Sequence, residues 1–365
     1  MARSNYRTKL SSLRSRRLGL DVRSDLAKAA AQDETLLLSE SYVSRTSNEA
    51  VRYVIGSMQE LEPTYTSICY EEGQRVINQI TSGLGTYGIP ASYEYQGSLP
   101  LNIHIRFASD VDILVLHRGF FTSDPRGSLD SSYVVVPGTP IENLIQLRKS
   151  CESILEQAYP AANVDKTGSK SISISGGSLR RKVDVVPSCW HNTVQYQTSG
   201  RKHDREVKVL DKNIPTTITN SPFLHMLKIE TKDVLTDGGA KKVIRLLKNV
   251  RSDSERNIKL SSYEIAALVW NFESVELQAS ELFELRLLAN AQRIIDWWAR
   301  NPQAAKKLIV PDGSRYILDT SEKVDALVSL SCDLDEIVLD VASELAGPNE
   351  SLSLARDILS RTTVA

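Results

Sequence analysis

Cysteine is scarce in this sequence. Its 365 residues include four cysteines, which lie far apart, at positions 69, 151, 189 and 332. A disulfide framework needs several cysteines at compact spacings, and a structural zinc site needs cysteine or histidine pairs a few residues apart. Neither pattern occurs, so we expect a reduced, intracellular protein without a disulfide framework or a structural zinc site.

The sequence also lacks an excess of charge of either sign. Lys and Arg number 44, Asp and Glu number 45, and the formal net charge is -1. Proteins that bind duplex nucleic acid along its length usually carry a strong positive field. We therefore do not expect this class of function.

The two ends of the chain carry opposite charges. Residues 319–365 hold ten acids and three bases, a net of -7. The N-terminus holds the single acid Asp21 among these bases: Arg3, Arg7, Lys9, Arg14, Arg16, Arg17 and Arg23. Solvated helix faces would explain both ends. The alternative is that the basic segment folds back onto the acidic part of the chain or binds a partner.

Long hydrophobic runs are missing as well. No stretch approaches the ~18 apolar residues of a membrane-spanning helix, and no apolar region follows the basic N-terminus as it would in a secretory signal. We therefore expect a cytoplasmic protein that does not bind membranes. Hydrophobic residues make up 41% and charged residues 24% of the chain. This composition is typical of globular proteins and excludes disorder as the main state.

Apolar spacing divides the chain into helical and strand-rich parts. Apolar residues recur at threes and fours from about Asn48 to Leu84, at 141–158 and, after Pro222, as far as residue 345, which predicts helices. Short alternating segments between these parts predict strands. The sequence thus predicts an α+β fold. Its parts are a helical segment with a basic start at 1–62, a mixed β-sheet lobe at 63–215 and a helical lobe at 216–365.

Three aspartates lie in strand-like segments. Asp110 and Asp112 begin the segment SDVDILVLH, and Asp184 lies in the segment KVDVVP. Side chains two residues apart on a strand project to the same side, with about 6 to 7 Å between their Cα atoms. If the two strands are neighbours in one sheet, the three carboxylates converge, and they repel one another unless a cation such as Mg²⁺ binds. The sequence therefore predicts a two-metal site for phosphoryl or nucleotidyl transfer.

A glycine and a serine precede these acids. Gly97 and Ser98 follow Gln96 in the segment YQGS, with Ser98 twelve residues before Asp110. Glycine lets backbone N–H groups approach a phosphate, and the serine hydroxyl adds a donor. An acid pair or a Gly-Ser turn alone is common on protein surfaces, and only their combination predicts a nucleotide site. Residues 176–178, Gly-Gly-Ser, are expected instead to be the turn of a hairpin between SISIS and RRKVDVVP.

A cationic stripe is predicted in the helical part. Lys241, Arg245 and Lys248 are spaced four and three residues apart and share one helix face. Ser261 or Ser262 would cap the next helix and present free N–H groups to an anion. This arrangement would neutralise a triphosphate. The alternative is a solvated helix face followed by an ordinary cap.

Taken together, these segments resemble the nucleotidyltransferase superfamily that includes polymerase β and, within it, the cGAS/DncV-like nucleotidyltransferases, or CD-NTases. The resemblance covers about residues 50–300. It rests on Gly97-Ser98, Ser109-Asp110-Val111-Asp112, Val183-Asp184-Val185-Val186-Pro187, Arg245-Leu246-Leu247-Lys248 and Leu260-Ser261-Ser262-Tyr263-Glu264. It implies a two-lobed polymerase β-like fold, with a mixed β-sheet palm lobe and a helical second lobe.

The resemblance also implies roles for individual residues. The three aspartates would be catalytic and would bind Mg²⁺ or Mn²⁺. Lys248 and Ser262 would contact the donor triphosphate, and Tyr263 would stack on the base. The implied nucleotide-binding residues are Gln96, Gly97, Ser98, Asp110, Lys248, Ser262 and Tyr263.

The implied function is synthesis of a cyclic di- or trinucleotide second messenger in bacterial anti-phage (CBASS) signalling. The partners would be nucleoside triphosphates, an effector that the product activates, and regulatory proteins. Duplex DNA is not expected, because no zinc-binding cluster of Cys and His follows the core. Two alternatives stay open: a single transfer to tRNA, a protein or a small molecule, or a catalytically idle nucleotide-binding protein. The intact aspartates speak against the idle protein.

Overall fold

The computed structural model describes residues 5–18, 41–106 and 109–364. Arg3 and Arg23 of the basic N-terminal segment lie outside the described residues. The chain forms two compact units. The helical unit consists of Met1–Leu61, Asn102–Phe107 and Lys228–Ala365, and the sheet unit consists of Glu62–Leu101 and Ala108–Leu227. These units differ from the three consecutive ranges expected above, because the N-terminal segment and a short internal segment join the C-terminal helices.

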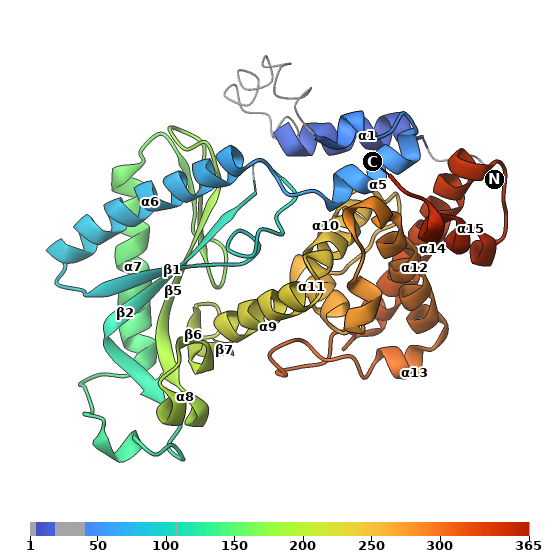
Figure 1. The fold of residues 1–365 in the computed structure, drawn as a ribbon. Helices are drawn as coiled ribbons and strands as arrows, with labels where there is room; N and C mark the ends of the chain where they lie inside the picture. The colour runs from blue at the N-terminus through green and yellow to red at the C-terminus, as the bar shows by residue number, and fades with distance from the viewer. Residues whose placement is uncertain (1–4, 19–40, 107–108, 365) are drawn as a thin grey trace. The chain divides into compact units, whose positions relative to one another are not determined.

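The sheet unit is built on one mixed sheet of seven strands (Figure 1). The strands are β1 (Ala91–Gln96), β2 (Val111–Ser123), β3 (Asn163–Asp165), β4 (Ile172–Ser175), β5 (Val183–Asn192), β6 (Glu206–Asp211) and β7 (Thr216–Asn220). Their order is β1-β2-β5-β4-β3, and β6 pairs with both β5 and β7. Strands β2 and β5 are parallel, and the other pairs are antiparallel. The predicted hairpin is confirmed as the β4–β5 pair, and the sheet continues past residue 215 into β7.

Two long helices, α6 (Pro63–Thr86) and α7 (Pro140–Ala158), pack on one face of this sheet (Figure 1). The period-two alternation of β2 and β5 turns Val111 and Val183 into the core under these helices. The opposite face of β2 carries Leu114, which joins a smaller apolar cluster. The remaining helical turns of the unit are η1 (Asp130–Ser132), α8 (Val194–Ser199) and η2 (Lys202–Asp204). The alternation thus leaves even-numbered positions of β2, among them the aspartate, on the face away from α6 and α7.

The helical unit contains no strand of the sheet within its described residues. Its helices are α1 (Tyr6–Leu18), α4 (Ser41–Ser44), α5 (Glu49–Met58), the end of α9 (Pro222–Leu235), α10 (Gly239–Asp253), α11 (Ser262–Trp270), η3 (Ser274–Leu277), η4 (Glu281–Phe283), α12 (Leu285–Arg300), α13 (Pro302–Ala305), α14 (Ser321–Ala346) and α15 (Leu352–Arg361). The prediction of a helical chain after Pro222 is therefore confirmed. Among the described helices, none is long and apolar enough to cross a membrane.

The basic N-terminal segment folds back onto its own unit. Arg16 of α1 is buried and forms a two-pronged ion pair with Asp253 of α10, at 2.5 and 2.6 Å. Arg17 is also buried and donates to the backbone carbonyls of Gln59 and Glu60, at 3.2 and 2.7 Å. The explanation by a solvated helix face is thus wrong for these two arginines, which are buried in the helical unit. Their contacts include the carboxylate of Asp253, the side chain of Asn249 and the backbone carbonyls of Gln59 and Glu60.

Candidate active site

Two of the predicted aspartates lie side by side on the sheet. Strands β2 and β5 run parallel in a register that pairs Asp112 with Asp184. The neighbouring pairs on either side place valine and isoleucine in the core, so both carboxylates belong to the opposite face. Asp110 lies just before β2 and has an exposed side chain (46%). The strand pairing that the sequence argument requires is therefore present.

A lysine that the sequence argument did not assign joins these acids. The ammonium of Lys182 lies 2.8 Å from Oδ2 of Asp110 and 3.1 Å from Oδ2 of Asp184. Partial burial works against its charge, but the hydrogen bonds and attraction to both carboxylates outweigh burial, and the pKa of Lys182 is raised. Lys182 precedes Asp184 by two residues and therefore shares its side of the strand.

Asp112 shows the electrostatic repulsion expected among close carboxylates. Burial, and then the charges of Asp184 and Asp110, raise the pKa of Asp112 to about 7. The Oδ1 atom of Asp184 is buried and has no hydrogen-bond partner in the described part of the chain. Carboxylate oxygens are the ligands that Mg²⁺ and Mn²⁺ prefer, so this donor set suits a divalent cation.

In this conformation the side chains of Asp110, Asp112 and Asp184 do not form a complete metal-binding site. Within residues 5–18, 41–106 and 109–364, no group of three His, Cys, Asp or Glu side chains is gathered closely enough to hold a metal ion. The Lys182 ammonium supplies the positive charge between Asp110 and Asp184 instead. The residues fit a divalent ion by their chemistry, and binding it would require their side chains to rearrange.

A glycine lies directly against the buried aspartate. Strand β1 ends at Gln96, whose register partner is Asp112, and Gly97 follows with a φ of 78°. A Cβ atom on Gly97 would lie 2.4 Å from Oδ2 of Asp112. Any other residue would therefore displace this carboxylate as well as strain the backbone. Ser98 follows in the same turn, and the buried side chain of Leu99 anchors the turn in the core.

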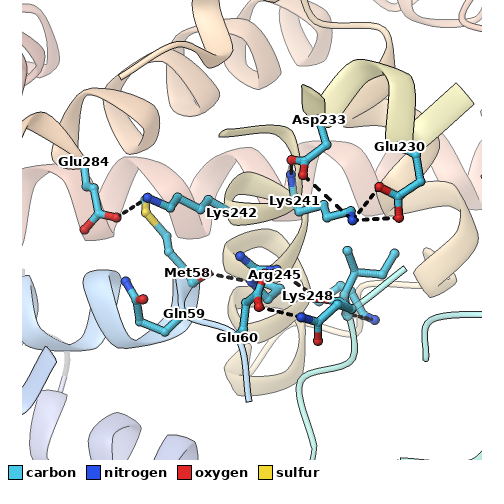
Figure 2. A network of polar contacts seen from close by, with 12 residues as sticks. Met58, Gln59, Glu60, Glu230, Asp233, Lys241, Lys242, Arg245, Lys248 and Glu284 are labelled. Atoms are coloured by element: carbon cyan, nitrogen blue, oxygen red, sulfur yellow. Dashed lines mark hydrogen bonds and ion pairs between the residues drawn. The ribbon is translucent and has the colours of Figure 1, made fainter. Parts of the chain in front are cut away.

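The predicted cationic stripe on α10 is engaged in contacts within the helical unit, as Figure 2 shows. Lys241 pairs with Glu230 at 2.7 and 2.8 Å. Arg245 donates to the carbonyl of Met58 at 2.6 Å, and Lys248 donates to the carbonyl of Ile103 at 2.6 Å. Both Arg245 and Lys248 are only 3% exposed. The alternative of a solvated helix face is therefore wrong for these two residues.

Burial changes the pKa of Lys248. Removal from water, with the nearby charges of Arg251 and Arg245 adding to it, lowers the pKa of Lys248 to about 7. An unfolded lysine keeps its proton up to about pH 10. Between these values the unfolded chain binds more protons than the folded protein, so the free energy of unfolding rises with pH.

We therefore expect Lys248→Met to remove part of this pH dependence. Between pH 7 and 9 the free energy of unfolding should rise more steeply in the unsubstituted protein than in Lys248→Met, by up to about 1 kcal/mol per pH unit. Urea unfolding at pH 7, 8 and 9 measures both slopes. The exposed residue Lys307 offers a control, since Lys307→Met should keep the steeper slope. Equal slopes in Lys248→Met and the unsubstituted protein would contradict the lowered pKa.

The start of α11 follows the sequence prediction closely. Ser261 is the N-cap, and its hydroxyl accepts from the backbone N–H of Glu264 in a capping box. Ser262 is the first residue of the helix. The hydroxyl of Tyr263 donates to Asp312 at 2.8 Å, and the guanidinium of Arg315 lies 5.6 Å from its ring centre. Of the two serines considered, Ser261 is thus the cap, and the roles of Ser262 and Tyr263 toward a nucleotide stay predictions.

The predicted residues fall into two groups. Gln96, Gly97 and Ser98 belong to the sheet unit together with the three aspartates, and the structure brings Gly97, Asp112 and Asp184 together. Lys248, Ser262 and Tyr263 belong to the helical unit.

Comparison with known proteins identifies the family. A family model for the cGAS/DncV-like nucleotidyltransferase C-terminal helical domain matches residues 228–329. The chain is also 37% identical over 326 residues to the cyclic dinucleotide synthase CdnE of Yersinia aleksiciae, an alignment that covers 88% of this chain and 85% of that protein. The chain belongs to the cGAS/DncV-like nucleotidyltransferases. It is therefore an enzyme of the nucleotidyltransferase class.

Other CD-NTases match along most of their length. A c-di-GMP synthase of Lachnospiraceae bacterium (strain RUG226) is 28% identical over 350 residues, which cover 88% of this chain and 99% of that protein. The solved structure of a STING-associated CdnE c-di-GMP synthase from Capnocytophaga granulosa has a TM-score of 0.73 at 24% identity and covers 92% of this chain and 97% of that one. The α+β nucleotidyltransferase fold expected from the sequence, with its N-terminal helix, is thereby confirmed.

Proposed function

We propose that this CD-NTase joins two nucleoside triphosphates into a cyclic dinucleotide and that it requires Mg²⁺ or Mn²⁺. The observation that carries the proposal is the pairing of Asp112 with Asp184 on parallel strands, with Gly97 directly against Asp112. The relative from Yersinia aleksiciae is named a cyclic dinucleotide synthase, and the relative from Lachnospiraceae a c-di-GMP synthase. Both names support a cyclic product made of two nucleotides.

The aspartates supply the chemistry of the proposed site. Asp110, Asp112 and Asp184 would hold the divalent ions. When bound, these ions neutralise charge on the triphosphate and make the attacking hydroxyl more acidic. The fixed pairing of β2 and β5 keeps the backbones of Asp112 and Asp184 in register, so little reorganisation of the strands is needed when a nucleotide binds.

The loop after β1 and the helical unit are proposed to bind the nucleotides. Gly97 leaves room for backbone N–H groups beside the Asp112 carboxylate, and Ser98 adds a hydroxyl donor for a phosphate. Gln96 ends the strand that carries this loop. The roles that the family resemblance gives to Lys248, Ser262 and Tyr263 in donor binding are part of the same proposal.

The proposed setting is bacterial defence signalling in the cytoplasm, where nucleoside triphosphates are available. The solved Capnocytophaga granulosa enzyme is described as STING-associated, and a CdnC enzyme from E. coli MS115-1, at 14% identity and a TM-score of 0.51, was solved in complex with a HORMA protein. By analogy, we propose that the product activates a separate effector and that a regulatory protein controls synthesis.

The test is a product analysis. The purified full-length protein is incubated with all four nucleoside triphosphates and Mg²⁺ or Mn²⁺, treated with phosphatase and examined by mass spectrometry. A phosphatase-resistant cyclic dinucleotide that EDTA abolishes is the expected result. Release of pyrophosphate only after addition of tRNA, protein or a small acceptor would indicate the single-transfer enzyme. Nucleotide binding without any turnover would indicate the idle protein, and both results would contradict the proposal.

A further inference from the structure

A lysine occupies the place between two of the three site carboxylates. Lys182 contacts Asp110 at 2.8 Å and Asp184 at 3.1 Å, and its side chain is 40% exposed. The same side chain therefore bridges the residue before β2 and the second residue of β5. It is the partner that the structure gives to the exposed carboxylate of Asp110.

The backbone fixes the position of this lysine. The carbonyl of Lys182 accepts a hydrogen bond from the N–H of Val111 at 3.0 Å, which extends the β2–β5 ladder by one step. The preceding residue, Arg181, is buried, and so is Leu179 of the same loop. The backbone of Lys182 is thus held beside β2, and its partly exposed side chain reaches the carboxylates of Asp110 and Asp184.

The Lys182 ammonium neutralises only part of the negative charge of the three carboxylates. Three carboxylates at the ends of two adjacent strands repel one another, as the raised pKa of Asp112 reflects. One ammonium brings a single positive charge and reaches one oxygen each of Asp110 and Asp184. The buried Oδ1 of Asp184 stays without a described partner. A divalent ion would bring twice the charge and more ligand positions than the ammonium does.

We propose that Lys182 is a tethered cation that competes with the catalytic divalent ion for Asp110 and Asp184. Before the ion binds, Lys182 holds these two carboxylates together and limits their repulsion. Ion binding displaces the ammonium, so Lys182 raises the ion concentration at which the site fills. This inference rests on the proposed function, because it assigns the same aspartates to metal binding.

The experiment measures ion binding in the absence of nucleotide. Mn²⁺ is titrated into the full-length protein, and free Mn²⁺ is followed by electron paramagnetic resonance. We expect Lys182→Met and Lys182→Gln to bind Mn²⁺ roughly three- to tenfold more tightly than the unsubstituted protein, as the loss of two partly exposed ion pairs predicts. Lys182→Arg keeps the competing charge and should not tighten binding. Using two neutral variants keeps the test decisive if one of them folds poorly.

A second lysine of the sheet unit provides the matched control. Lys166 is 42% exposed and pairs with Glu156 at 2.5 Å, so Lys166→Met removes the same charge and breaks an ion pair of similar exposure. Its Mn²⁺ affinity should equal that of the unsubstituted protein. Thermal unfolding gives a second readout: without divalent ions Lys182→Met should unfold at a lower temperature than the unsubstituted protein, and saturating Mn²⁺ should close this gap.

Two results would overturn the inference, and they differ in what they say about the proposed function. If neutral Lys182 variants bind Mn²⁺ equally or more weakly while the unsubstituted protein binds it and forms product, Lys182 does not compete and the proposed function stands. If neither the unsubstituted protein nor the Lys182 variants bind Mn²⁺ and no product forms, the metal site itself is wrong, and both proposals fail.

Discussion

Asp112→Asn is expected to abolish nucleotide transfer while making the protein more stable. Asp112 is the aspartate paired in register with Asp184, and an amide cannot replace its charge toward a divalent ion. We expect turnover to fall by about a thousandfold or more, since removing a group of this kind removes transition-state stabilisation. The free energy of unfolding is expected to increase, because the substitution removes one of three carboxylate charges that repel one another.

The stability gain follows from the raised pKa of Asp112. The folded carboxyl titrates at about 7, and the unfolded one near 4, so the folded state binds more protons between these values and loses stability as pH rises through them. At pH 8 Asp112 is mostly ionised in the folded protein, so its charge destabilises the folded state by nearly the full amount that the raised pKa implies. Asp112→Asn should therefore raise the free energy of unfolding at pH 8, measured with urea and without divalent ions, by about 1 to 3 kcal/mol.

A matched control separates the site from a general charge effect. Glu156 is an exposed carboxylate on α7, the helix that covers the other face of the sheet. Glu156→Gln removes the same charge from the same unit and should leave turnover within about twofold. Substantial product formation by Asp112→Asn would remove Asp112 from the proposed site. A loss of stability at pH 8 would show that its charge is compensated in the folded protein.

The sheet half of the site could be predicted because it depends on local rules. Strand alternation alone decides which side chains of β2 and β5 share a face, and both segments place valine or isoleucine in the core. Once the two strands are adjacent, Asp112 and Asp184 share one face of the sheet, and the observed register pairs them directly. Lys182 obeys the same rule, but a single lysine beside an acid has no distinctive pattern by which its role could be recognised.

The helical half of the site could be predicted only in part. The spacing of Arg245 and Lys248 correctly places them on one face of α10, but it does not reveal what covers that face. Arg245 also pairs with Glu60, but the shorter hydrogen bonds of the two residues go to the backbone carbonyls of Met58, Asn102 and Ile103, which lie between 143 and 187 positions away in the chain. Backbone carbonyls occur at every residue, so side-chain patterns give no signal for such contacts.

Gly97→Ala is expected to remove activity through a single methyl group. Its Cβ would lie 2.4 Å from Oδ2 of Asp112, well inside van der Waals contact, so the carboxylate or the β1 loop must move. Displacement of a catalytic group by about 1 Å costs about a hundredfold in rate, and we expect turnover to fall at least that far. The positive φ of 78° adds backbone strain, so the free energy of unfolding should also fall, by about 1 to 2 kcal/mol.

Gly176 separates these two effects. It has a φ of 77°, close to that of Gly97, but a Cβ atom there would meet nothing within 4 Å. Gly176→Ala should therefore lose a similar amount of stability in urea unfolding and keep its rate of product formation, because the strain is the same and no carboxylate is displaced. If Gly176→Ala loses activity to the same extent as Gly97→Ala, backbone strain in the sheet unit explains both variants. The contact between Gly97 and Asp112 would then have no specific role in nucleotide transfer.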